Sequence, residues 1–251
     1  MPITDEATWQ EQCASGECFD TSVQSLRVIE AVSDVVFTDV EFQSVQFDCD
    51  EMTDVKFIDC VFTASTFRSL RFHDCVFRRC RFYDRETETG CEFRFSNLGG
   101  TVFNNCDLSM ADFARANLYR AEFTDCQVQG ADFSQVTAES DVGGKVRLFD
   151  LSITDCNFAY SSFAGAELQS ATINGSRLIH TDFSRANLAE ADLRDNEWHG
   201  MTATGLTLNG ADLRGSSLDG LDIRELDMSG VTIDSFQQRS LLEAIGMTVL
   251  D

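Results

Sequence analysis

The sequence predicts an all-β solenoid, in which short strands form a coil with four sides. A bulky apolar residue returns at every fifth position, a small residue precedes it by two, and a polar residue separates the pair. In residues 106–126, CDLSMADFARANLYRAEFTDC, the bulky residues are Leu108, Phe113, Leu118 and Phe123. A helix places apolar residues three and four apart and a half-buried strand places them two apart, so a count of five fits neither.

Three tracts carry this count, from Phe37 to Phe82, from Phe93 to Phe133 and from Ile153 to Ile233. They hold 10, 9 and 17 bulky positions, and only Ala203 among them is weak. Five residues per side give a coil of 20 residues, which buries its interior by stacking on neighbouring coils. With strands about 4.8 Å apart, roughly nine coils predict a rod of about 43 Å over residues 35–233.

Two interruptions of the count predict loops. Phe82 and Phe93 are 11 residues apart, so we expect a short loop at 83–90. Between Phe133 and Ile153 bulky residues are lacking and two glycines occur, so we expect a longer loop at 136–147. Loops inserted into a solenoid often bind partners, although a tolerated insertion without a role explains either loop taken alone.

The two ends of the chain depart from the count. We expect residues 1–34 to form an N-terminal segment or cap. Residues 234–251 predict a short capping helix that begins after Asp234 or Ser235 and stops at Gly246. Any solenoid needs a cover on its open end, but the apolar side chains here also favour a twofold dimer: Phe236, Leu241, Leu242, Ile245, Met247 and Val249.

The chain is strongly acidic, with 42 Asp and Glu against 19 Lys and Arg and a net charge of −23. Along the predicted rod this is about one charge per 1.9 Å, close to about one per 1.7 Å in duplex DNA. Such a field disfavours nucleic acid and anionic membranes and favours a basic protein surface. We expect an acidic face formed by outward carboxylates, each of which alone is explained by solubility: Asp112, Glu122, Asp132, Asp182, Asp192, Asp212 and Asp222.

Several classes of protein are disfavoured. The ten cysteines are read as reduced core residues because most of them precede a bulky residue by two, and Cys13 with Cys18 leaves only a weak metal pair. Three isolated histidines and scattered carboxylates indicate no catalytic set, so we expect no enzyme, no metal and no cofactor. No basic segment precedes an apolar run near the start and no apolar stretch could span a membrane, so we expect a cytoplasmic protein.

Several segments resemble the Qnr quinolone-resistance proteins of the pentapeptide-repeat family. They are CRFYDRETETGCEF from Cys80, CDLSMADF from Cys106, QGADF from Gln129, LDGLDIRELDMSGV from Leu218 and DSFQQRSLLEAIGMTV from Asp234. The resemblance implies a right-handed quadrilateral β-helix and a homodimer. It also implies a DNA mimic that binds the type II topoisomerases, DNA gyrase and topoisomerase IV, and protects them from quinolones.

The same resemblance implies that both loops contact the topoisomerase. By position, the partner-binding residues would be Tyr83, Asp84, Arg85, Glu86, Glu88, Glu139, Asp141, Gly143, Gly144 and Lys145. Two alternatives stay open. One is a structural or scaffolding β-helix with an unrelated protein partner, since this fold alone implies no function. The other is an immunity protein against a gyrase-directed toxin.

Overall fold

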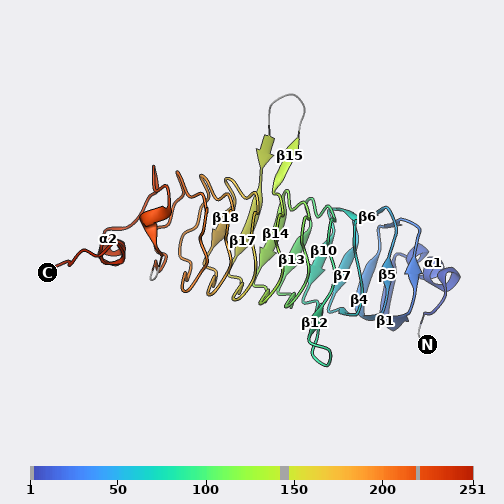
Figure 1. The fold of residues 1–251 in the computed structure, drawn as a ribbon. Coiled ribbons are helices and arrows are strands. Elements are labelled where there is room, and N and C mark those ends of the chain that lie inside the picture. The colour runs from blue at the N-terminus through green and yellow to red at the C-terminus, as the bar shows by residue number, and fades with distance from the viewer. Residues whose placement is uncertain (1–2, 142–146, 219–220, 251) are drawn as a thin grey trace.

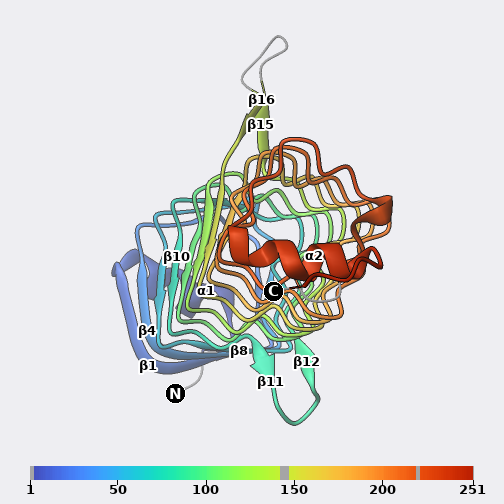
Figure 2. The same ribbon diagram turned by 90° about the vertical axis from the view of Figure 1, so that its left-hand side faces the viewer.

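The computed structural model describes residues 3–141, 147–218 and 221–250. The chain winds into a rod, with its N-terminus at one end and its C-terminus at the other (Figure 1). A view along the rod shows a coil with four sides (Figure 2). The predicted right-handed quadrilateral β-helix, with two inserted loops and a short C-terminal helix, is confirmed.

Parallel pairing between successive coils defines the sheets. The largest sheet contains β1 (Glu17–Gln24), β4 (Val36–Gln43), β7 (Lys56–Ile58), β10 (Val76–Arg78), β13 (Val102–Asn104), β14 (Ala121–Thr124), β17 (Leu151–Thr154) and β18 (Thr172–Asn174), with β8 (Val61–Thr63) paired to β4. Two smaller sheets contain β2 (Arg27–Val28) with β5 (Gln46–Phe47), and β3 (Val32–Ser33) with β6 (Glu51–Thr53) and β9 (Arg71–His73).

The pairing register measures the length of each coil. Lys56 pairs with Val76, twenty residues later, as four sides of five residues require. Val76 pairs with Val102, twenty-six residues later, and Ala121 pairs with Leu151, thirty residues later. The first insertion therefore adds six residues to its coil and the second adds ten.

Bulky side chains from successive coils stack inside the rod. Phe57, Phe77 and Phe103 lie almost parallel, with ring centroids 4.8 and 4.9 Å apart. Rings on adjoining sides meet edge to face, as Phe57 and Phe62 do at 5.4 Å. Both arrangements are favourable for aromatic pairs and contribute about 0.5–1.5 kcal/mol each beyond burial. The five-residue count thus exists because each bulky residue must lie above its equivalent in the previous coil.

Most corners of the coil have a residue with positive φ, two positions after the bulky one. Ser44 (φ 55°) and Asp125 (φ 54°) are examples, and Gly130 (φ 70°) takes the same place elsewhere. Asp, Asn, Ser and Gly tolerate this left-handed conformation best. A carboxylate just before the bulky residue supports the corner, since Asp132 Oδ1 accepts the Ser134 N–H at 2.8 Å. Polar residues at these positions therefore have a local structural role.

The coil begins earlier than the count indicates. β1 pairs with β4 from Glu17 opposite Val36, nineteen residues apart, so residues 17–34 form a coil rather than only a capping segment. Its inward residues are small, with Cys18 opposite Phe37, and helix α1 (Glu6–Ala14) fills the remaining space. Trp9 of α1 is fully buried and stacks on Phe37 at 5.2 Å. This coil lacks the bulky residue at every fifth position because Trp9, which lies outside the coil, fills the interior instead.

The C-terminal end is closed by polar contacts and a short helix. After the 3₁₀ turn η1 (Ile223–Glu225), the chain enters η2 (Ser235–Gln237) and helix α2 (Gln238–Ala244). Asp234 caps this segment, as predicted, and its N–H donates to Gln237 Oε1 at 2.6 Å. The buried Gln237 amide donates to the Leu213 and Ser216 carbonyls, both at 2.7 Å. Gln237 thus satisfies carbonyls that no further coil covers.

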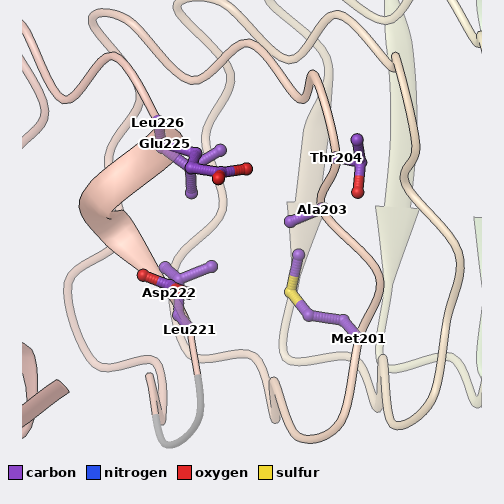
Figure 3. A pocket seen from close by; sticks show the side chains of 7 residues that line it. All are labelled: Met201, Ala203, Thr204, Leu221, Asp222, Glu225 and Leu226. Carbon is purple, nitrogen blue, oxygen red and sulfur yellow. The ribbon is translucent and has the colours of Figure 1, made fainter.

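An open pocket of about 200 Å³ lies near this end, where the weak bulky position Ala203 leaves the interior underfilled (Figure 3). Met201, Leu221 and Leu226 also line it, and Ala203 faces the gap between the coil and η1.

We predict that Ala203→Leu raises the free energy of unfolding by about 1 kcal/mol, because it fills this pocket with apolar atoms. Thermal and urea unfolding measure the change. Ala191→Leu is the matched control, since Ala191 is buried in a filled coil and a larger side chain there should destabilise by about 1–3 kcal/mol. An Ala203→Leu protein less stable than the wild type would contradict the explanation.

We predict that Phe103→Ala lowers the free energy of unfolding by about 3–5 kcal/mol, because it leaves a cavity between the rings stacked above and below. Phe103 stacks on Phe77 and on Phe123, both at 4.9 Å. Phe19→Ala serves as the control because Phe19 is 68% exposed, and it should change the stability by less than about 0.5 kcal/mol. Equal effects of the two substitutions would show that ring stacking does not hold the coils together.

Candidate functional site

The first loop is a short hairpin that leaves the coil between two of its sides. β11 (Tyr83–Asp84) pairs antiparallel with β12 (Thr89–Gly90). The Asp84 carboxylate accepts the Glu86 N–H and the Thr87 hydroxyl, both at 2.9 Å, and these bonds lower its pKa. The hairpin returns over the neighbouring coil at Gly90, where a Cβ would lie 2.4 Å from the backbone of Met110 and Ala111.

Side chains at the tip of this hairpin face solvent. Arg85, Glu86 and Glu88 are exposed, whereas Tyr83 and Asp84 are half-buried at its base. The tip is therefore held by a network within the hairpin and presents both signs of charge.

The second loop is a longer hairpin. β15 (Glu139–Asp141) pairs antiparallel with β16 (Arg147–Phe149). Its base is fixed by an ion pair of 2.9 Å between Glu139 and Arg147, and by the Asn117 amide, which donates to the Glu139 carbonyl at 3.0 Å. The predicted contact residues Gly143, Gly144 and Lys145 lie outside the described residues.

The two hairpins project in opposite directions from the rod. Figures 1 and 2 show β11 and β12 below the coil and β15 and β16 above it. The five-residue repeat explains these directions. The first hairpin leaves the coil after the side that contains Phe82, and the second leaves after the side that contains Ala138, which is two sides further around the coil. The predicted loop residues therefore form two separate sites.

The predicted acidic residues also fall on two sides of the rod. Bridges running through Ser162 join Asp112, Asp132 and Asp182 in one column. A second column runs from Glu122 to Asp192 and Asp212 through Ser152 and Thr172. Asp112 and Glu122 are ten residues apart, which is two sides of the coil, so the columns lie on opposite sides. Asp222 lies at the start of η1.

Arginines neutralise part of this acidic set. Asp112 pairs with Arg94 at 2.8 Å. Asp192 pairs with Arg194 and Asp212 with Arg214, both at 2.6 Å. The Arg224 guanidinium lowers the pKa of Asp222 to about 2. Within the described part of the chain, Glu122, Asp132 and Asp182 make no ion pair and carry uncompensated charge.

A further acidic group occupies corners of the coil. Asp125, Asp155 and Asp195 follow their bulky residues by two, have positive φ and are exposed. None of the three has an ion pair among the residues that the structure describes. The sequence analysis considered the position before the bulky residue, although Asp also recurs two positions after bulky residues of one side. These corner carboxylates add to the field that an approaching partner meets.

The proposed dimer segment is divided between the interior and the surface. Phe236 is 68% and Met247 54% exposed, and Leu242 is also exposed. Leu241 is instead buried in the core cluster, while Ile245 and Val249 are half-buried. Leu241 therefore attaches α2 to its own rod, and the exposed three remain available to a second chain.

The described residues contain no group of three or more His, Cys, Asp or Glu side chains able to hold a metal ion. The ten cysteines form no disulfide, and burial raises the pKa of Cys75 to about 11 and of Cys91 to about 12. Such thiols stay protonated at neutral pH and fill the core. Among the described helices, none is long and apolar enough to cross a bilayer.

Comparison with known sequences gives one family and two relatives. The model of pentapeptide repeats matches residues 89–135, 150–185, 161–195 and 202–233. The pentapeptide repeat protein QnrB4 of Escherichia coli is 31% identical over 102 residues, covering 41% of this chain and 47% of the relative. The quinolone resistance pentapeptide repeat protein QnrB96 of Scandinavium goeteborgense is 31% identical over 102 residues, 41% of this chain and 48% of its own. The match thus spans about half the length of these curated relatives.

Solved structures show likeness over most of the rod. Trypsin-treated QnrB1, a plasmid-mediated fluoroquinolone resistance protein, superimposes with a TM-score of 0.63 at 26% identity and covers 90% of this chain and 99% of its own. Full-length QnrB1 gives a TM-score of 0.55 at 27% identity and covers 90% and 100%.

We predict that either hairpin can be removed without unfolding the rod. Deleting residues 84–89 brings Gly90 to the corner and Cys91 to the small inward position before Phe93, which restores the count. Deleting residues 140–149 likewise places Asp150 at a corner, five residues before Asp155. Both proteins should unfold cooperatively, at or above the wild-type temperature, because loop entropy is removed.

Deletion of residues 114–119 is the control for the shorter deletion. It also removes six residues, but from an uninterrupted coil, so it shifts the count by one and turns inward residues outward. That protein should fail to fold. If all three deletions unfolded alike, the hairpins would not be separable insertions.

Proposed function

The chain belongs to the pentapeptide-repeat family, and on this premise we propose that it is a Qnr-like protector of bacterial type II topoisomerases. In this proposal the rod binds DNA gyrase and topoisomerase IV as a mimic of duplex DNA and protects them from quinolones. The main support for the proposal is that the chain forms a straight rod of net charge −23 from which two hairpins, β11–β12 and β15–β16, project. Its likeness to QnrB1 and QnrB4 supports the same role.

Charge gives the rod its attraction to a basic surface. Carboxylates without an ion pair recur from coil to coil, including Asp125 and Asp155 at one corner and Asp132 and Asp182 on one side. A surface that binds duplex DNA carries Lys and Arg matched to regularly spaced phosphates. Regularly spaced carboxylates satisfy the same cations, and the long-range field speeds the encounter.

The hairpins supply the selectivity that charge lacks. Charge alone attracts any basic surface, so discrimination requires features that fit one partner and clash with others. The β11–β12 tip presents exposed Arg85 together with Glu86 and Glu88, a mixed pattern that DNA itself does not carry. Because the hairpins point in opposite directions, they fit two separate regions of a partner that encloses the rod.

Further parts of the proposal concern assembly and location. A homodimer joined through the exposed Phe236, Leu242 and Met247 would double the length of the acidic rod, and burial of these side chains would stabilise it. The role requires no catalysis and no cofactor, because binding alone would either destabilise the cleavage complex that the drug stabilises or keep the drug from it. It places the protein in the bacterial cytoplasm, together with its topoisomerase partners.

We predict that the intact protein restores DNA supercoiling by gyrase in the presence of an inhibitory fluoroquinolone. The proteins lacking 84–89 or 140–149 should lose most of this rescue, because the acidic rod remains but the selective contacts are gone. The assay titrates all three proteins against fixed gyrase, plasmid and drug. Their thermal unfolding curves, measured beside the assay, show that each variant is folded.

Failure of the intact protein to rescue or to inhibit gyrase at any concentration would overturn the proposal. That result would favour a scaffolding rod with an unrelated partner. Full rescue by both deletion proteins would instead remove the hairpins from the mechanism.

A further inference from the structure

One corner of the coil differs from the others in chemistry. It consists of Met110, Gly130, Tyr160, His180 and Gly200, which we call the carboxylate-free edge. The N–H groups of the first four donate to the next coil, as Met110 does to Gln129 at 2.9 Å and Tyr160 does to Ile179 at 2.9 Å. They therefore follow one another along the rod.

The side chains of this edge contact one another from coil to coil. The Tyr160 and His180 rings stack at 5.1 Å, and His199 lies edge-on to His180 at 6.1 Å. Met110 lies over Gly130, where an added Cβ would be 2.6 Å from the Met110 sulfur. Gly90 of the β11–β12 hairpin packs on the Met110 backbone, so the edge continues directly from the hairpin.

No carboxylate belongs to this edge. The residues preceding its five members are Ser109, Gln129, Ala159, Ile179 and His199. In a chain with 42 acidic residues and net charge −23, such a neutral surface running across several coils stands apart from its surroundings.

Stability does not explain the large residues on this edge. Met110 (φ 59°), Tyr160 (φ 63°) and His180 (φ 55°) all adopt the left-handed conformation, which side chains of this size disfavour. Met110 is 51% and Tyr160 60% exposed, so neither gains much from burial. Corners on the other sides carry Asp, Ser and Gly but also long polar residues such as Arg115 and Gln135, whose side chains are exposed to water. Exposed apolar side chains in an unfavourable backbone conformation point to binding.

Acidic residues flank the edge on both sides. On one side runs the column of Asp112, Asp132 and Asp182. On the other side Asp107 and Glu197 share a column with Arg177, which pairs with Glu197 at 3.4 Å. Tyr and Met are enriched at the centres of protein interfaces, which polar and charged residues surround. The complement of this surface is an apolar patch with Lys and Arg around it.

We propose that the carboxylate-free edge is a docking surface for a protein partner that presents an apolar patch rimmed by Lys and Arg. Met110, Tyr160 and His180 make the central contacts and extend the surface of the β11–β12 hairpin. The inference rests on the proposed function, and within it the partner is the topoisomerase. The edge contributes short-range affinity and fixes the rotation of the rod about its axis, which a field spread over several sides leaves undefined.

The test compares binding of full-length proteins to immobilised DNA gyrase. The variant is the triple substitution Met110→Asn, Tyr160→Asn and His180→Asn, since Asn suits the left-handed corner and keeps the carboxylates unchanged. The control is Phe95→Asn on the adjacent corner, because Phe95 also has φ near 62° and is 41% exposed. Unfolding temperatures of all proteins verify that the rods are intact.

We expect the triple variant to bind gyrase at least about 30-fold more weakly, as loss of a hot-spot cluster does, and the control to bind within about twofold of wild type. If the wild type binds gyrase and the triple variant binds it with equal affinity, the docking edge is overturned and the proposed function still stands. An equal loss in the triple variant and the control would also overturn it. Absence of wild-type binding would overturn the proposed function and the edge together.

Discussion

Stacking of each inward side chain on its equivalent in the next coil is the constraint on which the rod depends. The rings of Phe57 and Phe77 lie 4.8 Å apart and nearly parallel, and the backbone bonds of the paired strands have the same repeat. Because both kinds of contact connect only neighbouring coils, the register must be kept at every step. This constraint explains why a bulky residue returns every fifth position, and why the end coils need Trp9 and Gln237 to complete them.

The same constraint separates what the core fixes from what the surface may vary. Inward positions must be bulky or small in strict alternation, but insertions are tolerated wherever the register resumes afterwards. Both hairpins obey this rule, since their coils are longer by six and ten residues and then continue as before. Corners accept any residue that tolerates positive φ, so recognition side chains such as Tyr160 can be placed there without disturbing the core.

The count of five made much of the fold predictable from sequence. It identified the coil, the inward residues, the first hairpin and the cap at Asp234. It placed the second loop at 136–147, whereas Val136 and Ala138 still fill the core and the hairpin runs from Glu139 to Phe149. It did not reveal the coil of residues 17–34, because Cys18 and its neighbours are too small to fill the interior and Trp9, from a helix outside the coil, fills it instead. It did not show that Leu241 packs inward, because a single helical turn at a chain end has no repeat to set its orientation.

The candidate site was less predictable, because the count assigns a side chain to the inside or the outside but not to a partner. The count gave no sign that Asp192 and Asp212 are paired, yet Arg194 and Arg214, each two residues later on the same side of the coil, neutralise them. The carboxylate-free edge is visible only when residues twenty or more apart are aligned by coil, including the extra lengths of both hairpins.

The central claim is that an acidic rod binds a DNA-binding enzyme through its charge. The most direct test is the dissociation constant of the wild-type protein for DNA gyrase, measured at several salt concentrations. The account predicts that affinity falls steeply and linearly on logarithmic axes as salt rises from about 50 to 200 mM, as it does for DNA itself. An affinity that does not change over this range would contradict the account, because it would show that the field of the rod has no part in recognition.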